Sequence, residues 1–223
     1  MAIVAFDNAA FLSSGVSAAA LTITITAASN AVLLVAAHVN EAATLSSVVA
    51  GGVGCTRLAY VAGGTGNTQI WGLTAPAAGT LAISARFAGA NQAIWCLAAA
   101  TYTGCRTSAT PFGTAVVASA GPGLLATITV DSTASDMAVV AWGMSGVPVV
   151  TLGLSQTERG SATHSTSGKL VWGDRVGETS LTLSATAAGT ATWAIVAVNL
   201  IHSDSAVVVQ SWKYTLGMMG VGR

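Results

Sequence analysis

The three histidines are the side chains in this chain best suited to metal binding or acid–base catalysis. They lie at His38, His164 and His202, far apart in the sequence, and no cluster of His, Cys, Asp and Glu at metal-ligand spacing surrounds them. His38 and His202 each end an apolar stretch, which favours an imidazole at a sheet end with a backbone partner. Cys96 and Cys105 lack a C-x-x-C spacing and are expected to be small core residues. With Cys55 the chain has three cysteines, and this odd count fits reduced thiols. We therefore predict no metal site and no cofactor.

No catalytic motif is evident either. The eight acidic residues lack the close spacing on one strand face that a glycosidase pair would need. The stretch GMSGV (143–147) departs from the G-x-S-x-G elbow, and no glycine-rich loop precedes a Lys-Ser/Thr pair. We expect a protein without enzymatic activity, with a hydrolase on the same fold as the least favoured alternative.

Three tryptophans are candidates for stacking on sugar rings, as in a carbohydrate-binding module: Trp71, Trp142 and Trp172. The competing interpretation is core packing, because each indole buries a large apolar area. We favour core packing and keep glycan stacking as the alternative.

The composition constrains the partners. Hydrophobic residues make up 52% of the chain and charged residues 7%, against about 25% in an ordinary soluble domain, and the formal net charge is zero. The eight Lys and Arg residues are scattered, so we expect no nucleic-acid partner. So little charge predicts either a Ser/Thr/Ala/Gly surface or, as we favour, a surface covered by other subunits.

No membrane span or export signal is expected. The apolar run AVLLVAAHV (31–39) falls short of the roughly 20 residues that a spanning helix needs. The start MAIVAFDNAAF lacks a basic region followed by an apolar stretch and a cleavage site. The sequence thus predicts synthesis and assembly in a cytoplasm.

Hydrophobic periodicity predicts an all-β protein. Apolar and polar residues alternate in LTITIT (21–26), LAISARF (81–87) and LTLSAT (181–186), which is typical of half-buried strands. Other stretches are apolar on both faces, namely 31–39 and 137–144, and are expected to be covered on both sides. Glycine-rich breaks separate the strands.

The chain repeats itself. Residues 20–105 align with residues 125–203, with Trp71 opposite Trp172 and Trp95 opposite Trp193. Four or five antiparallel strands in the same order in each half predict a two-sheet sandwich of jelly-roll or related Greek-key topology. Residues 1–19 are then an N-terminal arm or edge strand, the sandwich spans 20–203, and 204–223 form a C-terminal strand or arm.

One stretch resembles a known module. The order IWGLTAPAAGTLAISARF…AIWCLAAATYTG is similar to a concanavalin-like or jelly-roll β-sandwich module of bacteriophage virion and tail proteins and of bacterial surface proteins. The resemblance covers roughly residues 20–202, and QTER (156–159) also fits it. It rests on Trp71, Leu73, Ala75, Pro76, Gly79, Thr80, Phe87, Tyr102 and Gly104. It implies a sandwich fold and a virion or surface location, and it carries over no catalytic residue.

Low charge, the resemblance and the lack of an export signal together predict a non-enzymatic structural protein of a bacteriophage virion: a decoration, spike or tail-associated component. The expected partners are copies of itself, with a trimer as first guess, and other virion proteins. The alternative is a carbohydrate-binding or adhesion module that recognises a host-surface glycan. The residues expected to mediate assembly lie in the C-terminal segment: Val207, Val209, Trp212, Leu216 and Met218.

Overall fold

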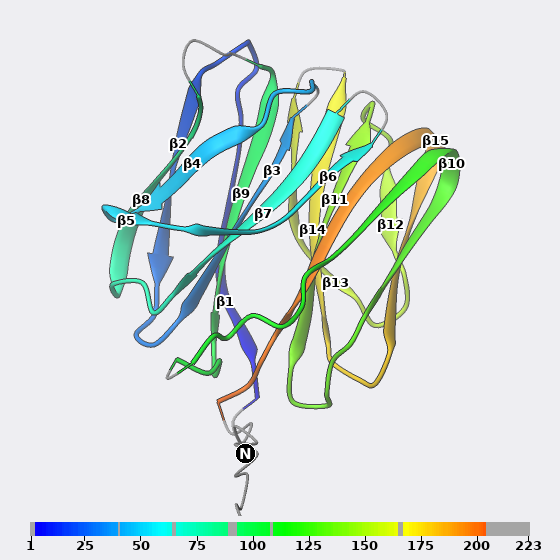
Figure 1. Cartoon of the computed structure of the whole chain (residues 1–223). Helices are drawn as coiled ribbons and strands as arrows, with labels where there is room; N and C mark the ends of the chain where they lie inside the picture. Colours follow the sequence, from blue (N-terminus) through cyan, green and yellow to red (C-terminus); the bar gives the residue numbers. More distant parts are fainter. Residues whose placement is uncertain are drawn as a thin grey trace, which may run out of the picture.

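The structure is a computed structural model that describes residues 3–39, 41–63, 66–88, 93–107, 109–164 and 167–203. Within these residues the secondary structure consists of β-strands without helix, and the strands pair antiparallel. The prediction of an all-β antiparallel sandwich made of two similar halves is confirmed, but the described strands form three hydrogen-bonded sheets where two were expected. The halves lie side by side in Figure 1, each with an outer and an inner layer of strands.

The first half consists of two hydrogen-bonded sheets. Its inner sheet has the order β1 (Ala5–Ser13), β9 (Trp95–Thr103), β3 (Val32–Val39), β7 (Gly66–Thr74), β6 (Thr56–Gly63). Its outer sheet has the order β2 (Ala20–Ala27), β8 (Gly79–Phe87), β4 (Leu45–Ala50), β5 (Val53–Gly54).

The second half forms one sheet because two long strands run through both of its layers. The sheet has the order β10 (Val116–Val130), β15 (Leu181–Leu200), β11 (Met137–Ser145), β14 (Gly168–Val176), β13 (Thr157–His164), and β12 (Val150–Leu152) also pairs with β15. The start of β10 pairs with the end of β15 in the inner layer, and the end of β10 pairs with the start of β15 in the outer layer.

Both halves are jelly rolls, in which the chain folds as a rolled-up hairpin. In the first half β1 pairs with β9, β2 with β8 and β3 with β7. The second half repeats these pairings with the two segments of β10 and β15 and with β11 and β14. Even the bulge in the β6–β7 pairing, between Arg57 and Ala59, recurs in the β13–β14 pairing, between Glu158 and Gly160.

The two halves share one pairing register. Val39 of β3 lies opposite Trp95, and Met144 of β11 lies opposite Trp193. Both indoles are fully buried, and both ring N–H groups donate to a backbone carbonyl. The expected equivalence of Trp95 and Trp193 is therefore confirmed.

The expected equivalence of Trp71 and Trp172 is wrong by one residue. Trp71 lies opposite Val35 of β3, and at the corresponding position of the second half Gly173 lies opposite Val140 of β11. A shift of one residue turns a side chain to the other face of a strand. Trp71 accordingly packs inside the first jelly roll, whereas Trp172 packs between the two halves.

Strands with alternating sequence form the outer layers. In β2, Ile23 and Ile25 face the core of the first half, while Thr22, Thr24 and Thr26 are exposed. One face of these strands meets water and the other meets the inner sheet, so the period of two in the sequence follows directly from the packing.

Strands that are apolar on both faces form the inner layers. In β3, Leu33 and Val35 pack in the core of the first half, whereas Val32, Leu34 and Ala36 pack in a separate core between the halves. We call this second set, with its partners on β9, β11, β14 and β15, the interface core. Its apolar faces are covered by the same chain, so they offer no surface to a neighbouring copy.

The halves meet with approximate two-fold symmetry. The edge strand β6 of the first half contacts β10 and β15, and its counterpart β13 contacts β1 and β9. Each edge strand therefore lies against the equivalent pair of strands in the other half. This arrangement has the isologous form of a symmetric dimer, although one chain makes both halves.

We expect the interface core to contribute strongly to stability. Leu34 is fully buried there, and Leu34→Ala should lower the free energy of unfolding by about 2–5 kcal/mol through lost burial and the cavity that remains. Thr24→Ala, on the exposed face of β2, is the matched control and should change it by less than about 0.5 kcal/mol. Urea unfolding monitored by circular dichroism measures both; equal effects would contradict the packing described.

Candidate functional site

The three tryptophans proposed for glycan stacking lie inside the protein. Trp142 and Trp172 are fully buried, and Trp71 is 7% exposed. Trp142 packs edge-on against Trp193, with ring centroids 6.1 Å apart. The Arg57 guanidinium lies 5.7 Å from the ring centroid of Trp71. Sugar stacking requires an open ring face, so we assign these side chains to core packing.

The five residues expected to mediate assembly all lie outside the described residues: Val207, Val209, Trp212, Leu216 and Met218. Their role stays a prediction. The other candidate sites are two polar networks, a histidine pair and the exposed apolar surface.

A buried polar network crosses the boundary between the halves. The Arg159 Nε donates to Asp174 Oδ2 at 2.7 Å, and the Tyr102 hydroxyl donates to the same oxygen at 3.1 Å. The Trp172 indole N–H donates to the Tyr102 oxygen at 2.9 Å. Tyr102 belongs to the first half and the other three to the second, so we call these four residues the interface network.

The electrostatics of the interface network fit a structural role. Burial, followed by the negative charge of Asp174, raises the pKa of Tyr102 well above its usual value. The tyrosine therefore keeps its proton and serves as a donor to Asp174. The Arg159 guanidinium also lies 4.2 Å from the ring centroid of Phe6 in β1, a cation–π contact that again joins the halves.

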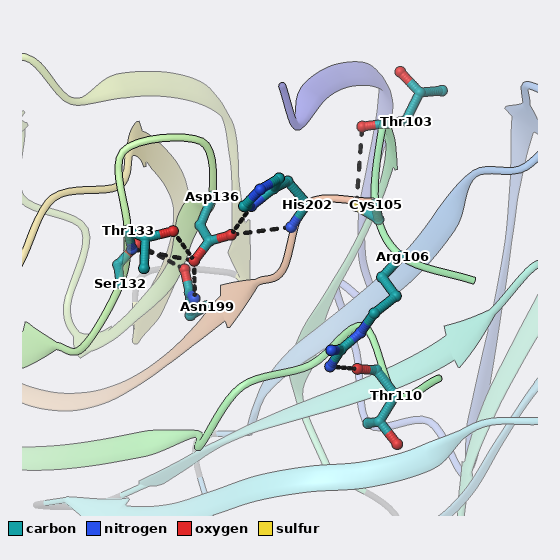
Figure 2. Close-up of polar contacts among 9 residues, drawn as sticks. All are labelled: Thr103, Cys105, Arg106, Thr110, Ser132, Thr133, Asp136, Asn199 and His202. Atoms are coloured by element: carbon teal, nitrogen blue, oxygen red, sulfur yellow. Dashed lines mark hydrogen bonds and ion pairs between the residues drawn. The ribbon is translucent and has the colours of Figure 1, made fainter. Parts of the chain in front are cut away.

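A second network surrounds Asp136 at the start of β11 (Figure 2). One carboxylate oxygen accepts the His202 backbone N–H at 3.0 Å and bonds to its ring Nδ1 at 2.8 Å. The other accepts the Asn199 amide at 2.9 Å and both the backbone N–H and the hydroxyl of Thr133. Burial alone would raise the pKa of Asp136, but hydrogen bonds from His202, Asn199 and Thr133 outweigh it and lower that pKa.

Cys105 lies opposite His202 in an isolated β-bridge, and His202 bonds to Asp136. A cysteine, a histidine and an acid in this sequence of neighbours also occur in enzymes with a cysteine nucleophile. Its electrostatics are those of an inert thiol. Burial, followed by the charge of Asp136, raises the pKa of Cys105 to about 12, whereas a reactive thiol needs a lowered pKa. The thiol instead points to the Thr103 carbonyl, at 3.9 Å.

The segment that connects the two halves lies against the end of β15, beside the Asp136 network. The Arg106 N–H donates to the Ile201 carbonyl at 2.9 Å, and the Arg106 side chain donates to the Thr110 carbonyl at 2.6 Å. Phe112 bridges to Leu200. The segment that leaves the first half is thereby fixed to the end of β15, next to the turn that Asp136 closes (Figure 2).

His38 and His164, far apart in the sequence, stack on each other at the boundary of the halves. Their ring centroids are 5.5 Å apart, and His38 Nδ1 lies 3.0 Å from the Thr68 hydroxyl. Burial and then the charge of His164 lower the pKa of His38 to about 3, and burial lowers the pKa of His164. Both rings are therefore neutral at pH 7.

Each of these histidines has a glycine as its counterpart. The position of His38 in β3 corresponds to Gly143 in β11, and that of His164 in β13 corresponds to Gly63 in β6. A Cβ on Gly143 would collide with His38 and with the Thr68 hydroxyl, and one on Gly63 would collide with a backbone carbonyl. The absence of a side chain at Gly143 thus leaves the room that His38 and Thr68 occupy.

No group of three or more His, Cys, Asp or Glu side chains in the described residues is arranged to hold a metal ion. The sequence separates the histidines by more than a hundred positions, so it gave no signal for the stacking of His38 on His164. Neither did it indicate the interface network, because Tyr102 and Asp174 come from different halves.

Two hollows lie on the surface of the described residues. One, of about 380 Å³, lies along β12 and is lined by Val149, Thr151, Leu152, Gly153, Thr186, Ala187 and Ala188. The other, of about 360 Å³, is lined by Thr56, Leu58, Gly72, Leu73, Thr74, Thr110 and Phe112. Neither lining includes a charged residue. Beside the first hollow Val149 is 72% exposed and Leu154 is 92% exposed.

Comparison with known proteins gives no match: no family model, no curated protein and no solved structure is similar to this chain. The described residues also contain no helix that is long and apolar enough to cross a membrane.

The interface network yields a first prediction. Tyr102→Phe leaves the Trp172 indole without its acceptor and removes one of the two donors to Asp174, and should lower the free energy of unfolding by about 1–3 kcal/mol. Glu178→Gln breaks the exposed ion pair with Arg175 and should cost less than about 1 kcal/mol. Urea titrations of the two variants and the parent decide the matter; no loss in Tyr102→Phe would contradict the proposed role.

The histidine pair predicts acid sensitivity. The pKa of His38 falls from 6.5 to about 3 on folding, so its contribution to stability is complete above pH 6.5 and is lost as the pH falls toward 3. The loss is at most about 1.4 kcal/mol per pH unit for one ring. Urea unfolding between pH 7 and pH 4 measures it. His38→Asn, which does not titrate, should flatten this dependence, and an unchanged slope would contradict it.

Proposed function

We propose that this chain is a non-enzymatic structural protein of a bacteriophage virion, a decoration, spike or tail-associated component that works by assembling with copies of itself. The observation that carries the proposal is the presence of large exposed apolar side chains on a protein with only 7% charged residues. Such a surface favours association, because little charge repulsion opposes the burial of apolar area.

The architecture also supports this proposal. Jelly rolls are the building blocks of many viral capsid proteins, although lectins use them as well. Two jelly rolls stacked through a continuous apolar core make a stiff unit suited to bearing load. Within the interface network, and within the Asp136 network, buried polar side chains hydrogen-bond across strands. Such bonds hold strands together, which supports a structural role for these side chains.

The carbohydrate-binding alternative has one observation in its favour. The second hollow combines three threonines with the side chain of Phe112, and neutral hydroxyls beside an aromatic ring suit a sugar. If that alternative holds, Phe112→Ala should abolish binding on a glycan array.

The state of association tests the main proposal. Sedimentation velocity of the full chain at micromolar concentration and physiological salt should give an oligomer, with a trimer as the first expectation. Antibodies raised against the chain should label purified phage particles from a host culture that carries the gene. A stable monomer that labels no particle would overturn the proposal and promote the glycan-binding alternative.

A further inference from the structure

We propose that the open edge of β12 is the docking site for residues 206–210 of a second copy of this chain, which add a strand to the outer layer of the second half. The inference rests on the proposed assembly function and deepens it by naming the two contacting parts. It is carried by the backbone of β12, by the exposed side chains around it, and by the position at which the described chain ends.

The backbone of β12 is free on one side among the described residues. The Ala188 N–H donates to the Val149 carbonyl at 2.8 Å, and the Gly153 N–H donates to the Ser184 carbonyl at 2.9 Å. Because antiparallel pairing alternates, Val150 and Leu152 direct their own N–H and C=O groups away from β15. Those groups form the template that an added strand would use.

The first half shows how this edge is covered elsewhere in the same fold. β4 occupies in the first half the place that β12 occupies in the second. β4 pairs with β8, which follows the β6–β7 hairpin, and β12 pairs with β15, which follows the equivalent β13–β14 hairpin. The β4 edge pairs with β5 (Val53–Gly54), which continues the outer sheet. In the described part of the second half, β12 has β15 as its strand partner and no equivalent of β5.

The side chains around β12 suit an apolar strand. Val149 and Leu154 are 72% and 92% exposed, and the hollow of about 380 Å³ beside them has no charged residue in its lining. Open strand edges in soluble proteins usually carry charges that prevent pairing. This edge instead presents a valine and a leucine to the solvent.

The C-terminal segment supplies a strand of matching chemistry. Residues 206–210 read Ala-Val-Val-Val-Gln, and they carry no charge. β-branched residues of this kind are the ones that fit best in a pleated sheet. Two valines on one face of such a strand would meet the exposed apolar side chains and the hollow, while the backbone pairs with Val150 and Leu152.

We assign the donor strand to a second copy because the proposed function is assembly between copies. A chain that pairs with its own β12 is the competing arrangement, and the cross-link described next distinguishes the two. From Ser203 to residue 208 an extended chain spans at most about 18 Å. Figure 1 shows the end of β15 (orange) leaving the molecule at a point far from β12.

A cysteine cross-link tests the contact between copies. Full-length chains with Leu154→Cys and full-length chains with Val209→Cys are mixed and oxidised with diamide. We expect a disulfide-linked dimer on a non-reducing gel. The matched control replaces Leu154→Cys with Val53→Cys, on the outer layer of the first half, where the native side chain is 55% exposed, and should give no dimer above background. A chain carrying both substitutions that links only within itself would overturn the assignment to a second copy.

Surface substitutions test whether this contact drives assembly. The double variant Val149→Lys/Leu154→Lys should weaken association at least tenfold in sedimentation experiments, and Val53→Lys should leave it unchanged. Val150→Pro, which removes an outward N–H without touching the β15 pairing, should also weaken it, with circular dichroism as the folding control. Oligomers unaffected by all these variants would overturn this inference and leave the proposed function standing, whereas a full chain that is monomeric throughout would overturn both.

Discussion

The burial of the second face of the inner strands governs the rest of this structure. β3, β9, β11 and β14 carry apolar side chains on both faces, and a jelly roll covers only one of them. The other face must meet a second apolar sheet, and the other half of the chain provides it. The stacking of the halves, the orientation of their edge strands and the places available for polar side chains follow from this single requirement.

Polar groups at the boundary of the halves then fix how the sheets align. An apolar contact alone is tolerant of sliding, because hydrophobic burial has no direction. The Arg159–Asp174 pair with Tyr102 requires defined positions, since each of these buried polar groups needs its own partner. The stacking of His38 on His164 likewise holds only where the two rings face each other. We infer that these side chains select one alignment, while the apolar residues supply most of the stability.

The sequence predicted the fold well because the fold depends on local patterns. Alternation in residues 21–26 and the two-sided apolar run in β3 report strand and burial without knowledge of any partner. The error at Trp71 and Trp172 arose because both are followed by glycine, and letter matching cannot detect a shift of one residue that reverses the face. The histidine pair and the interface network could not be predicted, because they join residues of different halves whose proximity only the packing creates. No chemical motif marked a site, so the candidate surface at β12 emerged from exposure and backbone pairing alone.

The glycine opposite His38 has a consequence for how such a molecule can be encoded. In a dimer of two identical chains, equivalent positions must hold the same residue, so a histidine at position 38 would face another histidine where this protein has Gly143. Joining both halves in one polypeptide removes that restriction. A large side chain on one side of the approximate two-fold axis can then face a glycine on the other side. The pairing of the halves also becomes independent of protein concentration. The two sides of this interface therefore carry different residues at equivalent positions, which two identical subunits could not do.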